Sequence, residues 1–303
     1  MTLKKTRSSC WVNGIIRGLG RDDFGYGFSS GKTKNGKEYR RIRFDLQTSN
    51  DNKIRVECFG MPMDEVYVFS KEKRGEFIKV PWKTRYQERE GYQKPNVSYD
   101  ICKDLDTLGD GASIRVKLSY DPNVYTNKMG EVKLMDSFLV ENFYELDTPI
   151  DLETNEEPII DLDFIFAKVS GDTIKGFTVD FRGEATPVNL LMDDEFDGGD
   201  ILGAVPPGTI MKAQGSIKGT AQVAQSAQYK YVETKYGKKR MRVTEGTTQG
   251  AKRGIYIFYA EPTNVQYEMS EVWNKNKINQ DKEEKPVKEE EPQKVETDDN
   301  DWF

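Results

Sequence analysis

The residues best suited to chemistry in this 303-residue chain are rings and guanidinium groups on one face of a predicted hairpin, residues 39–59. Apolar residues occupy every second position of both arms, and this period of two predicts half-buried strands. The solvent-facing positions between them hold Tyr39, Arg41, Arg43, Lys53, Arg55 and Phe59. Because rings stack on unpaired bases and cations neutralise phosphates, this face predicts binding to single-stranded nucleic acid.

Two other segments mix aromatic residues with cations. Residues 79–94 suggest a stacking loop, with a surface loop whose rings pack on the protein as the alternative. The candidates for contact with bases and phosphates in this loop are Trp82, Lys83, Arg85 and Tyr86. Residues 227–253 suggest a basic finger in which Lys238 and Arg240 either contact phosphate or belong to a solvated loop. Trp11, in the first predicted strand, is a further candidate for base stacking.

The sequence offers little for catalysis. It contains no histidine, the residue that shuttles protons in Ser or Cys triads and binds many catalytic metals. Cys10, Cys58 and Cys102 are widely spaced, which predicts buried hydrophobic residues and argues against a zinc site or a disulfide framework. The carboxylates between Asp193 and Asp200 do not match the spacing of an EF-hand loop, and a solvated acidic loop is the simpler interpretation. We therefore expect a protein that is not an enzyme and has no cofactor or metal.

The predicted strands fall into two series with a similar order. The first contains a strand at residues 10–16, the hairpin, a helical or irregular connector at residues 61–79, and a second hairpin that ends near residue 146. This order fits a five-stranded Greek-key barrel of the OB type. The second series contains strands at residues 159–169, 175–181, 185–191, 209–217 and 254–260.

We accordingly predict an all-β protein with minor α content, built from two OB-type Greek-key barrels and a disordered acidic tail. The expected parts are a first OB-fold domain with the basic aromatic face at residues 1–146, a linker at 147–157, a second OB-like domain at 158–272, and the tail at 273–303. Residues 281–303 hold ten Asp or Glu and four Lys, a charge of −6 that equals the net charge of the whole chain. The two predicted barrels are therefore neutral overall, with locally basic faces.

The chain ends in two aromatic residues behind three aspartates: Asp298, Asp299, Asp301, Trp302 and Phe303. Such a tip can seat its rings in a partner's pocket while basic residues of the partner meet the aspartates. The layout and the tip resemble single-stranded DNA-binding proteins, particularly those of bacteriophages. This resemblance implies that OB barrels hold the DNA strand, that the tail competes with DNA, and that the tip recruits replication, recombination and repair proteins such as a polymerase, helicase, primase or nuclease.

Two other functions fit parts of the sequence. A β-rich structural or interaction protein, such as a phage assembly component, would use the same tyrosines to pack against protein. A magnesium-dependent nucleic-acid enzyme would use Asp193 and Asp194. No segment approaches the roughly 18 apolar residues of a membrane span, and the N-terminus lacks the apolar centre of a signal peptide. We therefore expect a cytoplasmic protein without a membrane partner, located in the bacterial host cytoplasm if a phage encodes it.

Overall fold

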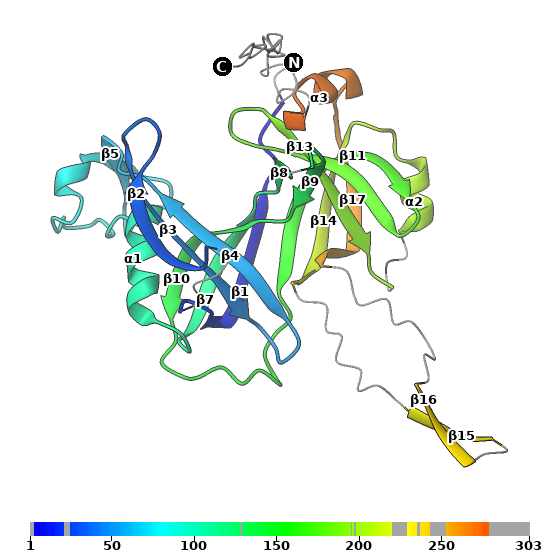
Figure 1. Ribbon diagram of the computed structural model, residues 1–303. Helices are drawn as coiled ribbons and strands as arrows, with labels where there is room; N and C mark the ends of the chain where they lie inside the picture. Colours follow the sequence, from blue (N-terminus) through cyan, green and yellow to red (C-terminus); the bar gives the residue numbers. More distant parts are fainter. Residues whose placement is uncertain are drawn as a thin grey trace, which may run out of the picture.

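The computed structural model describes residues 3–20, 25–127, 129–194, 196, 198–219, 229–234, 237–242 and 253–278. Strands dominate these residues and form two barrels that lie side by side (Figure 1). The N-terminal strand runs between them and belongs to the first barrel. No helix of the described residues is long and apolar enough to cross a membrane.

The first barrel is a closed five-stranded sheet with the order β3-β4-β10-β7-β1, closed by pairing of β1 with β3. All its neighbouring strands are antiparallel except β4 and β10, which are parallel. This order and the single parallel pair define an OB barrel. Its strands are β1 (Ser8–Arg17), β3 (Glu38–Gln47), β4 (Lys53–Gly60), β7 (Ser113–Tyr120) and β10 (Phe138–Glu145).

The second barrel repeats this arrangement with the order β12-β13-β17-β14-β11, closed by pairing of β11 with β12. Its single parallel pair is β13 with β17, at the position that corresponds to β4 with β10. The prediction of two OB-type barrels is therefore confirmed. The strands are β11 (Ile159–Ser170), β12 (Thr173–Val179), β13 (Ala185–Met192), β14 (Thr209–Lys218) and β17 (Gly254–Gln266).

Each barrel carries inserted elements between its strands. A hairpin separates the fourth and fifth strands of both barrels: β8 (Asn123–Thr126) with β9 (Val132–Met135) in the first, and β15 (Tyr229–Thr234) with β16 (Gly237–Arg242) in the second. Helices α1 (Ser98–Leu108) and α2 (Gly199–Ala204) follow the third strand of each barrel. The remaining elements are β2 (Gly27–Lys32), β5 (Glu65–Phe69), β6 (Phe77–Pro81), the short 3-10 helix η1 (Trp82–Thr84) and α3 (Met269–Asn274).

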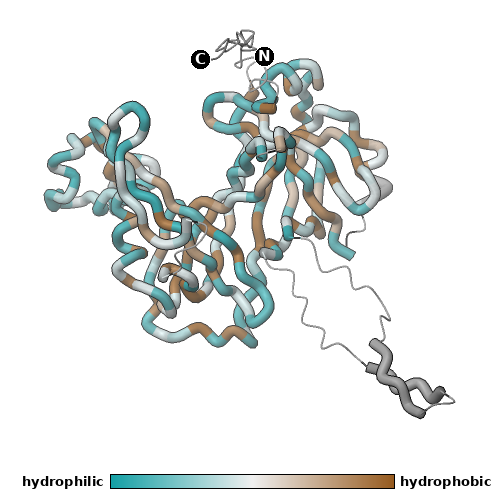
Figure 2. Tube along the Cα trace, in the orientation of Figure 1, coloured by the Kyte–Doolittle hydropathy of each residue, from teal (hydrophilic) through white to brown (hydrophobic). Residues whose placement is uncertain are grey.

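The sequence determines which side of each strand is buried. Ile42, Phe44 and Leu46 on β3 are fully buried, as the period of two predicts. Apolar residues are concentrated on the barrel strands, and hydrophilic residues are concentrated on the connecting loops (Figure 2). Cys10, Cys58 and Cys102 are free and buried, which confirms their predicted role as small hydrophobic residues.

The two barrels are joined by backbone contacts and by a continuous apolar core. Ser8 and Ser9 at the start of β1 pair with β11, and one cluster of buried side chains extends through both barrels. Asn52, in the turn after β3, donates to the carbonyl of Ile217 at 2.8 Å and accepts from the amide of Gly219 at 2.8 Å. We therefore expect the barrels to unfold together.

The structure differs from the sequence prediction in the segment between β4 and β7. Residues 61–79, predicted as a helical or irregular connector, contain β5 and most of β6, which form a two-stranded sheet over a small core of Val66, Val68 and Val80. The prediction also missed α1, whose buried face packs on the barrel. Gly60 permits this contact, because a Cβ atom there would lie 2.1 Å from the amide nitrogen of Tyr99.

Candidate nucleic-acid interface

The outer face of β2, β3 and β4 gathers the rings and cations that the hairpin pattern predicts. Cross-strand pairing sets Arg41 opposite Phe59 and Arg43 opposite Glu57. On the other side of β3, the outward positions of β2 are Gly27, Ser29 and Gly31, which are small. This face therefore has large side chains along β3 and β4 and small ones along β2. We call the side chains of Tyr26, Tyr39, Arg41, Arg43, Arg55 and Phe59 the outer face.

Two rings form a stack at one end of the outer face. The centroids of Tyr39 and Phe59 lie 5.8 Å apart with an interplanar angle of 27°. Gly31 gives the Tyr39 ring its space, since a Cβ atom there would lie 3.3 Å from the ring. Phe59 is 43% exposed, so its ring offers a surface on which a base can stack.

Arg41 supplies the least satisfied donor of the outer face. Its Nε is buried and has no hydrogen-bond partner within the described part of the chain. Such a group costs free energy unless an acceptor reaches it. The guanidinium also lies near the Gly25 loop, where a Cβ atom would be 3.5 Å from Nη2 of Arg41 and from Nη1 of Arg43. A phosphate oxygen at the accessible edge of this guanidinium would neutralise its charge.

The other two arginines of the outer face already have partners. Arg43 forms an ion pair with Glu57. The Nε of Arg55 donates to the hydroxyl of Tyr26 at 2.9 Å, and that hydroxyl donates to Asp45 at 2.6 Å. Partial burial and the hydrogen bond to Asp45 raise the pKa of Tyr26. These contacts hold the cations in place while leaving Arg55 exposed to solvent.

The predicted stacking loop lies elsewhere, against α1. The Arg85 guanidinium lies between the rings of Trp82 and Tyr86, 3.8 and 4.1 Å from their centroids. It also forms a bidentate contact with Asp100, with Nε to Oδ2 at 2.9 Å and Nη2 to Oδ1 at 3.0 Å. The Arg85 side chain is only 11% exposed, so its donors serve the protein, whereas Lys83 and Tyr86 face solvent.

Trp11 occupies a third location, on the outer side of β1, β7 and β10. Its ring stacks on Tyr144 with centroids 5.8 Å apart, and the Arg115 guanidinium lies 5.6 Å from the Trp11 centroid. The structure thus distributes the predicted binding residues of the first barrel over three faces. Tyr39, Arg41, Arg43 and Arg55 share one face, Trp82, Arg85 and Tyr86 form a second group, and Trp11 lies apart from both.

Several predicted residues fall where the structure gives no side-chain detail. Lys238 and Arg240 belong to β16, the second arm of the hairpin in the predicted basic finger. The tip residues Asp298, Asp299, Asp301, Trp302 and Phe303 lie outside the described residues.

The acidic loop contains no group of metal ligands in its described part. Asp193 in this loop pairs with Lys218 at 3.3 Å. Among the described residues, no three metal-ligating side chains gather in one place.

Two features were not predicted from the sequence: Tyr26, which belongs to the outer face, and a pocket between the two barrels. Tyr26 stands in a glycine-rich segment that indicates only a loop, and its aromatic character is the one signal that could have identified it. A pocket between the barrels combines Lys175 and Asn189 with Asp136, and residues so far apart in the sequence give no local pattern.

Comparisons with known proteins give a family and a distant likeness. The sequence model of the YorF family matches residues 28–297. No curated protein matches the chain. Among solved structures, the wild-type single-stranded DNA binding protein from Thermus aquaticus is 10% identical with a TM-score of 0.41, over 88% of this chain and 99% of that chain. A deletion mutant of the same protein is also 10% identical with a TM-score of 0.41, over 87% of this chain and 98% of that chain.

Proposed function

We propose that this chain, which belongs to the YorF family, binds single-stranded DNA without catalysis and largely without regard to sequence. The geometry of its outer face supports this function. Bases stack on Phe59 and Tyr39, and phosphates contact Arg41 and Arg55. Stacking contributes about 1 to 3 kcal/mol per base, and phosphate contacts release counterions, so salt weakens the binding.

The observation that carries this proposal is the Nε of Arg41, which has no hydrogen-bond partner among the described residues, next to an aromatic stack whose Phe59 ring is exposed. A structural arginine would use its donors internally, as Arg85 does. Arg41 keeps one donor, its Nε, without an acceptor among the described residues. The exposed ring of Phe59 beside it offers a flat surface on which a base can stack. An unpaired strand supplies both groups at adjacent positions.

The other predicted binding residues receive more limited roles in this proposal. Arg85 positions Trp82 and Tyr86, and the exposed Lys83 and Tyr86 extend the path of the strand. Trp11 binds only if the strand wraps to the opposite side of the barrel. Lys238 and Arg240 contact phosphates from the second barrel.

We extend the proposal to the cellular role that the sequence suggests. The protein acts in DNA replication, recombination or repair, is encoded by a bacteriophage, and works in the host cytoplasm. Its C-terminal tip recruits partner enzymes, and its acidic tail competes with DNA for the basic face. Deletion of residues 281–303 is expected to tighten DNA binding and to abolish partner recruitment; unchanged affinity at low salt would exclude the competition.

The direct test measures fluorescence anisotropy of labelled oligo(dT) at low and moderate salt, with unlabelled duplex as competitor. We expect binding that weakens with salt and resists duplex. Arg41→Gln should weaken it, whereas Lys103→Gln, on the exposed side of α1, should not. Failure of both the intact and the tail-deleted protein to bind would overturn the proposal.

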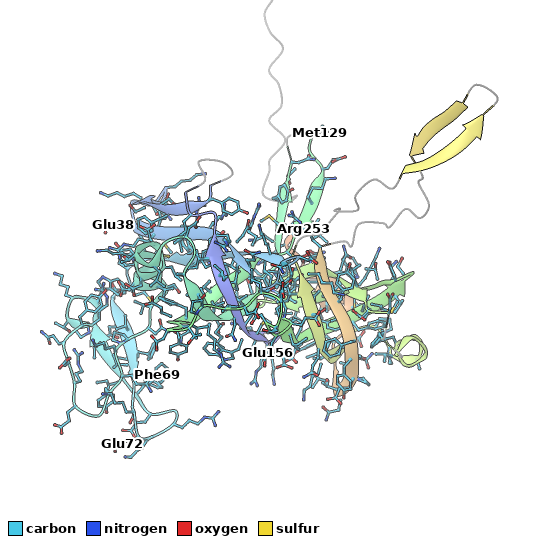
Figure 3. All side chains as sticks on the ribbon, turned by 90° about the horizontal axis from the view of Figure 1, so that it is seen from below. Glu38, Phe69, Glu72, Met129, Glu156 and Arg253 are labelled. Carbon is cyan, nitrogen blue, oxygen red and sulfur yellow. The ribbon has the colours of Figure 1, made fainter. Side chains whose placement is uncertain are left out.

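One observation favours a second candidate, a β-rich interaction protein. Tyr67, Phe69 and Phe77 are each about half exposed on the β5 and β6 hairpin, and Phe77 contacts each of the other two rings edge to face. Phe69 and Met129 lie at separate edges of the molecule (Figure 3). Serine at all three ring positions should leave oligo(dT) binding unchanged under the DNA-binding proposal and abolish capture of a protein partner under this alternative.

A further inference from the structure

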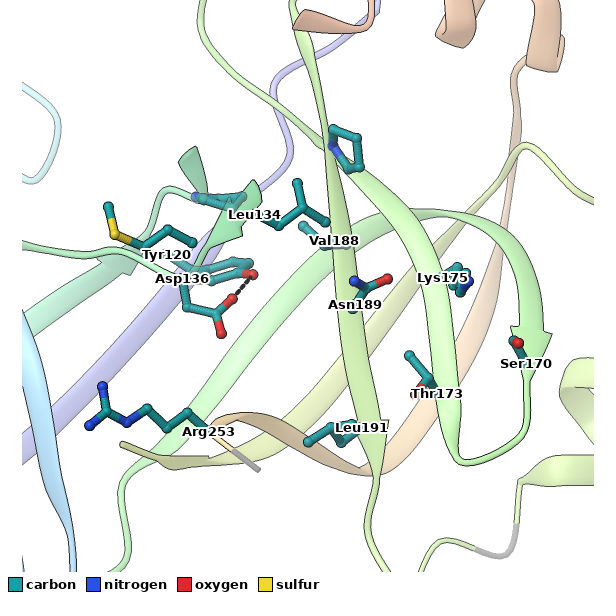
Figure 4. Close-up of a pocket in the computed structure, with 13 residues that line it drawn as sticks. Tyr120, Leu134, Asp136, Ser170, Thr173, Lys175, Val188, Asn189, Leu191 and Arg253 are labelled. Atoms are coloured by element: carbon teal, nitrogen blue, oxygen red, sulfur yellow. Dashed lines mark hydrogen bonds between the residues drawn. The ribbon is translucent and has the colours of Figure 1, made fainter. Parts of the chain in front are cut away.

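A pocket of about 400 Å³ lies where the first barrel meets the second (Figure 4). One wall is the side of β12 and β13 that points away from the core of the second barrel; these are the second and third strands of that barrel. The other wall comes from the first barrel, through Leu134, Met135 and Asp136 at the end of the β8 and β9 hairpin. In OB barrels, the face of the second and third strands and the loop between the fourth and fifth strands bind oligonucleotides. The pocket combines one such face with the other barrel's loop.

Polar and apolar side chains line the pocket in about equal parts. Leu134, Pro187 and Leu191 supply apolar surface. Lys175 and Asn189 are cross-strand neighbours on β12 and β13, and Arg253 lies near the opposite end (Figure 4). The volume falls within the usual range for small-ligand sites, and the mixed lining offers apolar surface to a ring and polar groups to its edge.

Asp136 is the distinctive group of this pocket. Its Oδ1 accepts a hydrogen bond from the buried Tyr120 hydroxyl at 2.6 Å (Figure 4). That contact fixes the carboxylate and leaves Oδ2 as an acceptor. Within the described part of the chain no cation pairs with Asp136, and partial burial of its carboxyl raises the pKa although the residue as a whole is exposed to solvent. A donor from a ligand would therefore stabilise the carboxylate.

We infer that this pocket holds one base of the bound strand and favours bases with an exocyclic amino group, such as cytosine, over thymine. The amino group donates to Oδ2 of Asp136, the Asn189 amide meets the same edge, and the ring packs against Leu134 and Pro187. A carboxylate accepts from the cytosine amino group but repels the carbonyl at the same position of thymine. Lys175 and Arg253 contact the flanking phosphates.

This inference rests on the proposed function, because the base must arrive as part of a strand held by the first barrel. It adds a selective site to otherwise sequence-tolerant binding. A good pairing to a base edge contributes about 1 to 3 kcal/mol. We therefore expect oligo(dC) to bind at least about fivefold more tightly than oligo(dT) of the same length.

The test compares labelled oligo(dC) and oligo(dT) of about 30 nucleotides, long enough to span two OB barrels, at pH 7.5. Asp136→Asn keeps an acceptor for the Tyr120 hydroxyl and turns a donor toward the base. It should abolish the preference for oligo(dC) while oligo(dT) affinity is retained. Asn189→Ala, at an exposed position, should reduce the preference without any effect on folding. Asp106→Asn, on the exposed side of α1, is the matched control and should leave both affinities unchanged.

The outcomes separate this inference from the proposed function. Equal binding of both oligonucleotides by the intact protein, or an undiminished preference in both Asp136→Asn and Asn189→Ala, would overturn the base pocket and leave strand binding intact. Binding of neither oligonucleotide would overturn the proposed function and the pocket with it. Loss of preference in the pocket variants alone would support the pocket.

Discussion

In the first barrel the outer face of the second and third strands, β3 and β4, carries Arg41, Arg55 and an exposed aromatic stack. In the second barrel the corresponding face of β12 and β13 carries Lys175 and Asn189 and is walled by the first barrel's hairpin. The strand order is the same in both. The comparison teaches that topology sets where a ligand can lie, whereas loops and outward side chains decide which part of the ligand each barrel contacts.

The helices that follow the third strand differ in the same way. α1 has 11 residues and anchors the Arg85 and Asp100 cluster, whereas α2 has six residues. The first barrel therefore has a polar brace outside its core.

The largest effect tests whether the two barrels are energetically separate. Phe44 in the first barrel and Phe164 in the second are fully buried in one continuous cluster. Phe44→Ala and Phe164→Ala should each lower the free energy of unfolding by about 3 to 5 kcal/mol, because each leaves a cavity. Calorimetry should show one transition that both variants shift to lower temperature. Two transitions, each moved by only one variant, would show independent barrels.

The second prediction concerns the brace of the first barrel. Asp100→Asn should lower the free energy of unfolding by roughly 1.5 to 3 kcal/mol, the range for hydrogen bonds to charged groups. The exposed Asp104→Asn on the same helix is the control and should change it little. Equal stability of the two variants in chemical denaturation would contradict a bracing role.

The same brace gives the unfolding free energy a pH dependence. Burial alone would raise the pKa of Asp100, but hydrogen bonds from Arg85 and Tyr86 outweigh it and lower the pKa below its ordinary 3.8. The folded state then binds fewer protons than the unfolded state in this range, so its contribution to stability is present above pH 3.8 and is lost as pH falls through the lowered pKa. Asp100→Asn should flatten this part of the stability profile.

The third prediction contrasts the two binding faces. Phe59→Ala removes a stacking surface and should weaken binding of oligo(dT) and oligo(dC) equally, by about 1 to 3 kcal/mol. Asn189→Ala should weaken only oligo(dC). Anisotropy titrations of both variants with both oligonucleotides measure this contrast. An unequal loss in Phe59→Ala would mean that the first barrel also discriminates between bases.

The smallest effect concerns phosphate contacts. Arg55→Gln should reduce the slope of log affinity against log salt by about 0.7, the value for one phosphate contact on a single strand. Lys103→Gln should leave the slope unchanged. Titrations over a range of salt concentrations measure it, and an unchanged slope in Arg55→Gln would remove this residue from the interface.

Much of the fold could be predicted from the sequence because barrel strands carry a local period of two. Ile54, Val56 and Cys58 alternate with outward residues on β4, and all three are buried. The pattern failed at β5 and β6, because these short strands stabilise each other through a small core that also needs Trp82 and Tyr92. It also missed α1, whose inward residues Ile101 and Leu105 are four apart.

Local patterns of residues are enough to predict which face of each strand is buried, the order of strands in two barrels and the buried cysteines. They also predict the cluster of Tyr39, Arg41, Arg43 and Arg55, because each of these features depends on neighbours in one strand or hairpin. The folded chain alone establishes that Arg85 is held by Asp100, that Trp11 lies on another face, and that Asp136 and Asn189 line one pocket between the two barrels. Those contacts join segments that chain closure brings together. No local pattern of residue types encodes them.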